Sequence, residues 1–537
     1  MGRLGTAGRR CLSLALVLLA LLCLGNTCTS DTGSSNLSVP DRDTLVLADS
    51  DPSTLDPALA REVGSVSYIM QIFSGLVTFD AGMNPVPDIA EGWETDGTGT
   101  IYTFHLREDA VFHDGRPVTA ADFRYSWERA CDPATGSQTA GTYLNDIVGA
   151  VDRLAGGAEE VSGIEVVDDR TLRVTIDRPK AYFLSKLAQP VSFVVDGQEA
   201  DGGGEWWRQP NGTGPFRLAG WEQGSLLLLE RNEDFYREKA GVGHVAYLFN
   251  AGYSMQLYEQ GRIDVTGVSI YSLERVMDES NALHPQLSIY PQYNITYLGF
   301  NCSGGPLADA RVRRALCLAV DRERVVSQVL LDSVEAAGGI VPPGMMGYDA
   351  GFAGLDYDVA AARALLAEAG YGPGGSPLKV VVTLPGSSGD LASYFTAVLY
   401  QWEENLGAEV EVRQLDGDAY FDRLGEERDD VFFFGWSADY PDPQDFLDVL
   451  FRNGSINNPG GYADAAYDSL LDRAAVEPDE SARAALYRQA EAKLVAEDAA
   501  CLPLWFGRSY LLIKPRVHGY ALSPLGYPLL SGVSVSD

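Results

Sequence analysis

The amino-acid sequence predicts an α/β protein that contains a doubly wound sheet with parallel strands. Three patterns support this fold class. Strand-like and helix-like segments alternate between residues 378 and 436, an amphipathic pattern covers 310–326, and shorter strands lie earlier in the chain. The chain has 537 residues, enough for several domains. Its 46% hydrophobic and 21% charged residues are typical of a globular protein.

The N-terminal half shows short strands and one clearly capped helix. Thr119 is placed to cap a helix that carries Phe123 and Trp127 on one face, as a helix packed on a core does. Three segments have the apolar pattern of strands, namely 101–108, 171–177 and 224–232.

The segment "ARVRRALCLAVDRERVV", residues 310–326, predicts one amphipathic helix. Val312, Leu316, Ala319 and Val320 fall on a single stripe of that helix. We expect this stripe to face the core.

The strongest alternation of elements lies between residues 378 and 436. It reads β-α-β-α-β, which predicts parallel pairing, and ligands bind beyond the carboxyl ends of strands in such sheets. Asp439 has that position, three residues after Trp436, and a carboxylate there suits a cationic ligand. The predicted strands are 378–384, 408–415 and 430–436, and the predicted helices are 391–407, closed by Gly407, and 418–427.

The N-terminus predicts an exported protein. Three arginines precede an apolar run at 11–25, which has the length of a signal-peptide core and is too short to span a bilayer. Residues 1–28 are the predicted signal peptide, with Cys28 the candidate for lipidation, and 29–41 are a polar tether. Ordinary cleavage and an uncleaved anchor remain alternatives. The expected location is the periplasm or the outer face of the cytoplasmic membrane.

The charge balance limits the possible partners. There are 40 Lys and Arg residues against 75 Asp and Glu residues, a formal net charge of −35. Such a chain is not expected to bind nucleic acid or an anionic membrane surface. With five histidines and no metal-binding spacing, the sequence predicts no metal site and no cofactor.

Four cysteines follow the tether, and no two of them form a C-x-x-C motif. Three disulfide pairings are possible, and buried free thiols are an equal alternative. These cysteines are Cys131, Cys302, Cys317 and Cys501.

Seven stretches in a fixed order resemble the peptide- and oligopeptide-binding proteins of ABC importers, solute-binding protein family 5. The resemblance covers nearly all of the chain after the signal peptide. The stretches are "STLDPALA", "IFSGLVTFD", "IAEGWETDGTGTIYTFHLREDAVFHDGRPVTAADFRYSWERACDP", "NGTGPFRLAGWEQGSLLLLERNEDFY", "TYLGFN…PLADARVRRALCLAVDRERVV", "VPPGM" and "GWSADYPDPQDFL".

The resemblance implies a multi-lobed periplasmic-binding-protein-like fold of type II with an extra lobe, which encloses its ligand by hinge closure. It also implies a monomer that makes and breaks no bond, and that delivers a short peptide to ABC permease and ATPase subunits. The implied lobes are I (42–73, 190–290 and 508–537), II (the insertion 74–189) and III (291–507).

The resemblance also implies a ligand site in the "GWSAD" loop. The aspartate of this loop, here Asp439, pairs with the free α-ammonium of a peptide in the oligopeptide-binding members. Trp436 is expected to wall the ligand, with Ser437 beside it and Trp505 as a second aromatic contact. Phe433 stands where one such binder has an arginine, so the capture of the ligand carboxylate is expected to differ.

Other chemistries fit less well. Asp439, Asp442 and Asp445 lack the spacing and the glycine of a calcium loop. A secreted hydrolase needs a nucleophile and a base in a recognisable motif, which the sequence does not show. Within binding proteins, another cationic or small solute such as a metal chelate, an opine or a glycan fragment remains an alternative.

Overall fold

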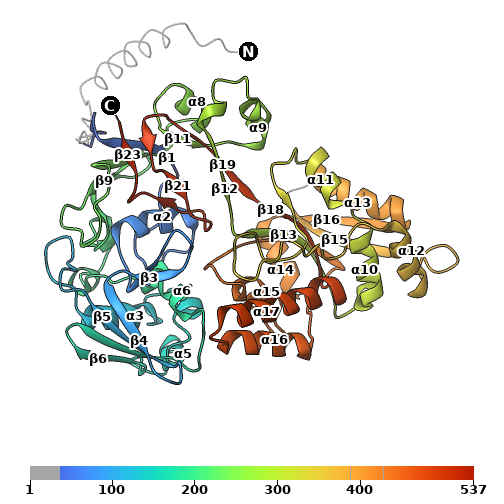
Figure 1. Ribbon diagram of the computed structural model, residues 1–537, viewed down its shortest axis with the longest axis horizontal. Coiled ribbons are helices and arrows are strands. Elements are labelled where there is room, and N and C mark those ends of the chain that lie inside the picture. Colours follow the sequence, from blue (N-terminus) through green and yellow to red (C-terminus); the bar gives the residue numbers. More distant parts are fainter. Residues whose placement is uncertain (1–36, 387–388, 427, 537) are drawn as a thin grey trace, which may run out of the picture. The chain divides into compact units, whose positions relative to one another are not determined.

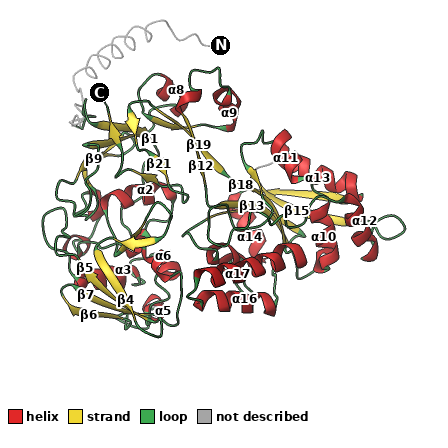
Figure 2. Cartoon of the chain, in the orientation of Figure 1, coloured by secondary structure: helices red, strands yellow, loops and turns green. Residues whose placement is uncertain are grey.

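The chain folds into several sheets (Figures 1 and 2). Its buried apolar side chains form separate cores. The computed structural model describes residues 37–386, 389–426 and 428–536. The chain divides into a unit Met1–Ser38 and a unit Val39–Asp537, and the description below concerns the second.

A four-stranded sheet begins at the first strand of the chain. β1 runs parallel to β10, and β9 and β8 follow in antiparallel pairing. The helix α2 (Val63–Ile72) packs on this sheet through Tyr68 and Ile69. The strand predicted at 224–232 is confirmed as β9. In spatial order the strands are β1 (Thr44–Ala48), β10 (His244–Leu248), β9 (Leu226–Arg231) and β8 (Phe216–Glu222).

A second four-stranded sheet is antiparallel throughout and packs on the helix α3 (Ala120–Ala130). Thr119 and Asp122 form a reciprocal capping box at the start of this helix. Phe123 and Trp127 are buried on the face that meets the sheet, as predicted. The strands are β4 (Ala90–Thr95), β5 (Ile101–Leu106), β7 (Thr171–Thr175) and β6 (Ile164–Asp168).

A three-stranded antiparallel sheet leads directly into the largest sheet. Its strands β12 (Leu287–Pro291) and β19 (Arg508–Ile513) are neighbours, and β11 (Val265–Gly267) pairs with β19. β12 is followed by β13 (Asn294–Phe300), and β19 is preceded by β18 (Cys501–Phe506), which pairs with β13 (Figure 1). Two adjacent chain connections therefore join the two sheets.

The largest sheet has six strands and confirms the predicted β-α-β-α-β segment. β15 pairs in parallel with β16 and with β17, whereas β13 is antiparallel to both β17 and β18. The order is β14 (Glu335–Ala336), β18, β13, β17 (Val431–Ser437), β15 (Lys379–Pro385) and β16 (Glu409–Leu415).

Helices pack on both faces of this sheet, which makes it doubly wound. One core gathers side chains from α10, α12 and α13, and the other gathers side chains from α14, α15, α16 and α17. Gly407 ends α13 with a left-handed backbone, φ 68°, as expected. The bounds are α10 (Ala310–Leu318), α12 (Val359–Glu368), α13 (Ser393–Leu406), α14 (Gly417–Glu426), α15 (Gln444–Phe451), α16 (Ala465–Val476) and α17 (Glu480–Glu491).

The prediction of one helix over 310–326 is wrong. The chain breaks after α10, and a second helix, α11 (Arg322–Gln328), begins at Asp321. The carboxylate of Asp321 accepts a hydrogen bond from the backbone N–H of Arg324 at 2.9 Å and so caps the new helix. The predicted apolar stripe is nevertheless fully buried.

The remaining elements are short and connect these layers. They are β2 (Val77–Phe79), β3 (Pro85–Pro87), α4 (Ala140–Tyr143), α5 (Ala150–Leu154), α6 (Phe183–Leu187), η1 (Pro190–Ser192), α7 (Gly197–Ala200), η2 (Trp206–Arg208), α8 (Ser254–Glu259), α9 (Ile270–Met277), η3 (His284–Gln286), η4 (Pro306–Ala308), η5 (Ala492–Glu497), β20 (Val517–His518), β21 (Ala521–Leu522), β22 (Pro528–Leu529) and β23 (Ser534–Val535).

The four cysteines of the described residues are free thiols. Cys131, Cys317 and Cys501 are buried and Cys302 is half-buried. Burial raises the pKa of Cys302 to about 11 and the pKa values of Cys131 and Cys317 to about 12. The sequence left both disulfides and free thiols open for these four cysteines, and the structure has free thiols.

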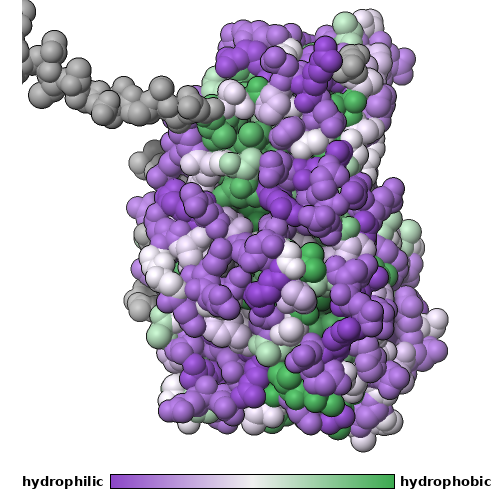
Figure 3. Space-filling view, turned by 90° about the vertical axis from the view of Figure 1, so that its left-hand side faces the viewer, coloured by the Kyte–Doolittle hydropathy of each residue, from purple (hydrophilic) through white to green (hydrophobic). Residues whose placement is uncertain are grey.

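Surface and membrane features agree with the composition. The face in Figure 3 carries mainly hydrophilic side chains with smaller apolar areas between them. Within the described ranges, no helix combines the length and the apolar character needed to cross a membrane. The apolar run 11–25 and Cys28 lie outside those ranges.

Candidate functional site

The strand β17 ends at the loop that the sequence singled out. Val431 and Phe432 are buried in the centre of the six-stranded sheet, and the backbone N–H of Ala438 donates to the carbonyl of Tyr293 at 2.7 Å. Asp442 then turns the chain into α15, because its carboxylate accepts the backbone N–H of Gln444 at 2.9 Å. This is a local side-chain turn of the kind that aspartate favours. Asp439 therefore lies beyond the carboxyl end of a central strand.

Asp445 holds this loop in place. One of its oxygens, Oδ2, accepts both the indole Nε1–H of Trp436 at 3.0 Å and the backbone N–H of Asp439 at 2.9 Å. The other oxygen, Oδ1, is buried and has no hydrogen-bond partner among the described residues. Burial and the neighbouring charge of Asp439 raise the pKa of Asp445 well above its usual range. A single buried carboxyl thus orients two of the predicted site residues.

Asp439 is half-buried where regions distant in the sequence meet. The side-chain amide of Gln189 donates to its backbone carbonyl at 2.6 Å. Burial raises the pKa of the Asp439 carboxyl, and a hydrogen bond from the Tyr143 hydroxyl opposes the rise. The charge of Asp439 in turn contributes, after burial, to the raised pKa of Tyr527, about 12. Tyr143 and Tyr527 therefore both lie near this carboxylate.

The charged groups near Asp439 are already engaged elsewhere. Arg483 forms an ion pair with Asp442, and Lys186 forms one with Asp146 at 2.8 Å. Within the described ranges, no Lys, Arg or His forms an ion pair with Asp439 or Asp445. Asp439 and Asp445 thus lack an ion-pair partner among the described residues, and a cation from a ligand would supply one.

Aromatic side chains surround the loop. The ring of Trp436 stacks on Phe434, with centroids 6.5 Å apart and an interplanar angle of 16°. Tyr440 stacks on Tyr182 at 6.3 Å and meets Tyr143 edge-on at 6.3 Å. Such surfaces contact apolar groups without selecting their shape.

Two of the predicted site residues, Phe433 and Trp505, are not brought together with Trp436. Phe433 and Trp505 point into the core on the opposite face of the sheet, because side chains alternate along a strand. There Phe433 meets Phe395 with ring centroids 4.7 Å apart, and Trp505 meets Tyr394 at 5.2 Å. Trp505 is 8% exposed. Ser437 is exposed at the end of β17, beside Trp436.

Sequence reasoning missed four residues at this site: Tyr143, Gln189, Asp445 and Tyr527. Asp445 carried a signal, since it stands in the acidic loop that was weighed as a calcium site. In the part of the chain that the structure describes, no group of three or more His, Cys, Asp or Glu is arranged to hold a metal ion.

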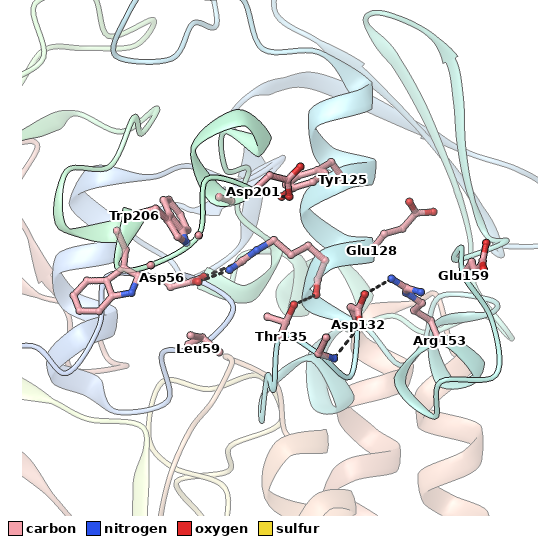
Figure 4. Close-up of a pocket in the computed structure, with 16 residues that line it drawn as sticks. Asp56, Leu59, Tyr125, Glu128, Asp132, Thr135, Arg153, Glu159, Asp201 and Trp206 are labelled. Carbon is pink, nitrogen blue, oxygen red and sulfur yellow. Dashed lines mark hydrogen bonds and ion pairs between the residues drawn. The ribbon is translucent and has the colours of Figure 1, made fainter.

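A cavity of about 520 Å³ lies elsewhere, and no predicted site residue lines it (Figure 4). Trp206, Trp207 and Tyr125 contribute aromatic surface to it. Its two arginines are already paired with acids: Arg129 with Asp56 at 3.0 and 2.5 Å, and Arg153 with Asp132 at 2.5 Å. We therefore place the candidate site at the β17 loop, where Asp439 and Asp445 have no such partner among the described residues.

Comparison with known proteins identifies the family. Residues 84–458 match the model of the bacterial extracellular solute-binding proteins, family 5. The chain is 31% identical to the periplasmic oligopeptide-binding protein OppA of Escherichia coli, covering 94% of both chains. It is 33% identical to the probable deoxycholate-binding periplasmic protein YgiS of the same organism, covering 88% of this chain and 89% of that one.

A solved structure agrees with this result. The unliganded open form of MppA, a periplasmic murein tripeptide-binding protein, superposes with a TM-score of 0.80 at 29% identity, covering 93% of this chain and 98% of that one. The family match and the similarity to these relatives agree with the fold and the site loop described above. This chain belongs to family 5 of the bacterial extracellular solute-binding proteins.

Proposed function

We propose that this protein is the extracytoplasmic receptor of an ABC importer and that it captures short peptides by their free α-amine. One observation carries the choice of ligand: Asp439 is a half-buried carboxylate at the end of a central strand, without a cationic partner among the described residues. A peptide ammonium would supply that charge through charge-assisted hydrogen bonds. The relatives OppA and MppA are named for binding oligopeptides and a murein tripeptide, which supports the proposal.

The proposed receptor has three lobes and closes about a hinge. The separate hydrophobic cores support this division. One core gathers residues from both ends of the described chain, a second lies mostly in the insertion, and two flank the six-stranded sheet. Hinge closure about a ligand is the usual motion of such proteins. The proposed lobes are I (42–73, 190–290 and 508–537), II (74–189) and III (291–507).

The similarity to a probable deoxycholate-binding protein raises a second candidate, an anionic amphipathic solute. The aromatic rings around Trp436 and Tyr440 would suit its apolar surface. A negatively charged Asp439, however, would repel a carboxylate, because like charges at short range in a desolvated site are unfavourable. The site loop therefore favours an ammonium ligand.

We also propose that the protein performs no chemistry and acts as a monomer held at the membrane by lipid on Cys28. Its partners would be the permease and ATPase subunits, with the ATPase supplying the energy of transport. Incubation of the purified protein with peptides separates this role from a hydrolase: a receptor returns the peptides intact, whereas catalytic turnover would refute the receptor.

The ligand proposal is tested by calorimetry with trialanine and N-acetyl-trialanine on the wild type and on Asp439→Asn. The substitution should cost roughly 2–5 kcal/mol of affinity for trialanine, as loss of a buried charge partner does. The acetylated peptide has no ammonium, so it should bind weakly to both proteins. Together the four measurements isolate the carboxylate–ammonium interaction.

The matched control is Glu404→Gln, which removes an exposed charge on α13 of the same lobe. It should bind trialanine as the wild type does. Equal binding of both peptides by the wild type and Asp439→Asn would exclude an amine site at Asp439. Failure of the wild type to bind trialanine or a mixed tripeptide library would overturn the peptide proposal itself.

A further inference from the structure

Asp445 is an unusual group in the site, because its carboxyl is fully buried and only one of its two oxygens accepts hydrogen bonds. It is 0% exposed. Its Oδ2 atom accepts two N–H donors, from Trp436 at 3.0 Å and from the backbone of Asp439 at 2.9 Å, whereas its Oδ1 atom has no partner. Burying an anionic oxygen without a hydrogen-bond partner raises the free energy of the folded state, and burying a protonated oxygen there raises it much less.

Ionic neighbours do not compensate the charge. From α17, Arg483 pairs with Asp442. From α6, Lys186 pairs with Asp146 at 2.8 Å and interacts more weakly with Asp445, with which it forms no ion pair. The remaining titratable groups of the described chain that face Asp439 and Asp445 are hydroxyls and acids, not cations. They are Tyr143 from α4, Tyr440 and Asp442 from the loop itself, and Tyr527 from the C-terminal segment, and burial keeps the three tyrosines protonated by raising their pKa values.

Two adjacent carboxyls that lack a cation do not both ionise. Asp439 is the better candidate for the charge, because it is half-buried and receives a hydrogen bond from Tyr143. Asp445 is fully enclosed, and the charge of Asp439 adds to the effect of burial in raising its pKa. Since Oδ2 is occupied by two donors, the proton belongs on Oδ1.

We propose that Asp445 is a neutral carboxylic acid that positions Trp436 and Asp439, and that it limits this end of the site to a single positive charge. This inference deepens the proposed function and rests on it for the identity of the ligand. It makes Asp445 a positioning residue, and it makes the ligand class a peptide with one ammonium at its N-terminal residue. A second ammonium next to the first would find no second anion.

The affinity test compares three variants with trialanine as the probe. Asp445→Asn keeps an acceptor for both N–H groups and is neutral, so it should lose less than about threefold, whereas Asp439→Asn should lose about thirtyfold or more. Asp445→Leu leaves both donors without an acceptor and should lose about tenfold or more. Asparagine at position 445 should thus retain most of the trialanine affinity that leucine removes.

Either of two results would overturn the inference. If Asp445→Asn loses as much affinity as Asp439→Asn, Asp445 is charged and pairs with the ligand itself. If Asp445→Leu binds as the wild type does, the carboxyl positions nothing. A tripeptide beginning with 2,3-diaminopropionate, which has a second ammonium, should bind no more tightly than trialanine; a clear gain would indicate a second anion.

A ligand-free measurement separates this inference from the proposed function. The carboxyl carbon resonances of labelled aspartates, followed with pH in the intact wild type, should show one site that stays protonated at neutral pH, and Asp445→Asn should remove that signal. Titration of the Asp445 carboxyl near its ordinary value of about 4 would refute its neutrality. This result holds even if trialanine does not bind, so the two proposals can fail separately.

Discussion

The side-chain oxygen of Asn294 accepts a hydrogen bond from the backbone N–H of Gly507 at 2.6 Å. Asn294 begins β13 and Gly507 lies between β18 and β19, so this bond joins the two connections between the three-stranded and six-stranded sheets. The contact is close: a Cβ atom added to Gly507 would lie 2.9 Å from the side chain of Asn294. We infer that this pair is part of the proposed hinge.

Gly507→Ala should disturb this pair and loosen the coupling between the two connections. We expect a loss of stability of about 1 kcal/mol from the weakened hydrogen bond, and a smaller decrease in radius of gyration when trialanine is added. Thermal unfolding and small-angle scattering measure these two effects. Gly267→Ala in β11 is the matched control, because a Cβ atom there meets nothing within 4 Å. Identical behaviour of the two variants would contradict a role of this pair in the proposed hinge.

Trialanine affinity should fall in acid. Burial raises the pKa of Asp439 above its usual value, and the ammonium needs the ionised carboxylate. Affinity is therefore full above that raised pKa and is lost as the pH falls through it. In Tyr143→Phe the opposing hydrogen bond is absent, so the midpoint should move to higher pH. Calorimetry between pH 4 and pH 8 tests this, and an unchanged midpoint would show that Tyr143 does not act on Asp439.

Glu491 should make stability depend on pH. It is buried, and its Oε1 atom accepts the backbone N–H groups of Ile340 at 2.6 Å and Val341 at 2.8 Å, but burial dominates and raises its pKa to about 7. The pKa of Glu491 is higher in the folded protein than in the unfolded protein, so this group stabilises the fold when the pH is below its unfolded pKa. That stabilisation is lost as the pH rises through about 7. This loss amounts to about 3 kcal/mol.

Denaturant unfolding at several pH values measures the slope. Glu491→Gln keeps an acceptor and cannot ionise, so its stability should be flatter between pH 4 and pH 8 than that of the wild type. Glu497→Gln, at an exposed position on the following turn, is the control and should keep the wild-type slope. Equal slopes for all three proteins would mean that Glu491 has an ordinary pKa.

The N-terminal prediction concerns Cys28, which lies outside the described residues. Mature protein from membrane fractions should begin at Cys28 and carry more than one acyl chain, because one chain alone gives only marginal binding. Intact-mass analysis decides this. Cys28→Ala should appear in the soluble fraction, and an unmodified N-terminus at another residue would contradict lipidation.

The sequence was sufficient for the elements whose pattern is local. Parallel strands at β15, β16 and β17 follow from apolar runs that helices separate, and Gly407 marks the end of α13. The break between α10 and α11 was missed because Asp321 also fits an exposed helical position. Only the bond from its carboxylate to the N–H of Arg324 distinguishes a cap from a helix interior.

The site residues likewise divide into those that a local sequence pattern predicts and those that it does not. Trp436 and Asp439 could be found because a strand end is a local feature with a known use. Tyr143 and Tyr527 could not be found, because each reaches Asp439 from a segment far away in the sequence. Phe433 was placed at the site by its neighbours in sequence, whereas the alternation of side chains along β17 turns it to the opposite face.

The buried thiols determine how the protein responds to oxidants. The reactive form of cysteine is the thiolate, and a pKa of about 11 or 12 leaves roughly one thiol in ten thousand or fewer ionised at pH 7. Cys501, whose pKa is raised still further, is the least reactive of the four. The proposed extracytoplasmic location lacks the reducing protection of the cytoplasm, and enclosure of these thiols within the fold would take over that role. We therefore expect the native protein to resist oxidation in air without a reductant, whereas unfolding would expose the same four thiols to oxidants.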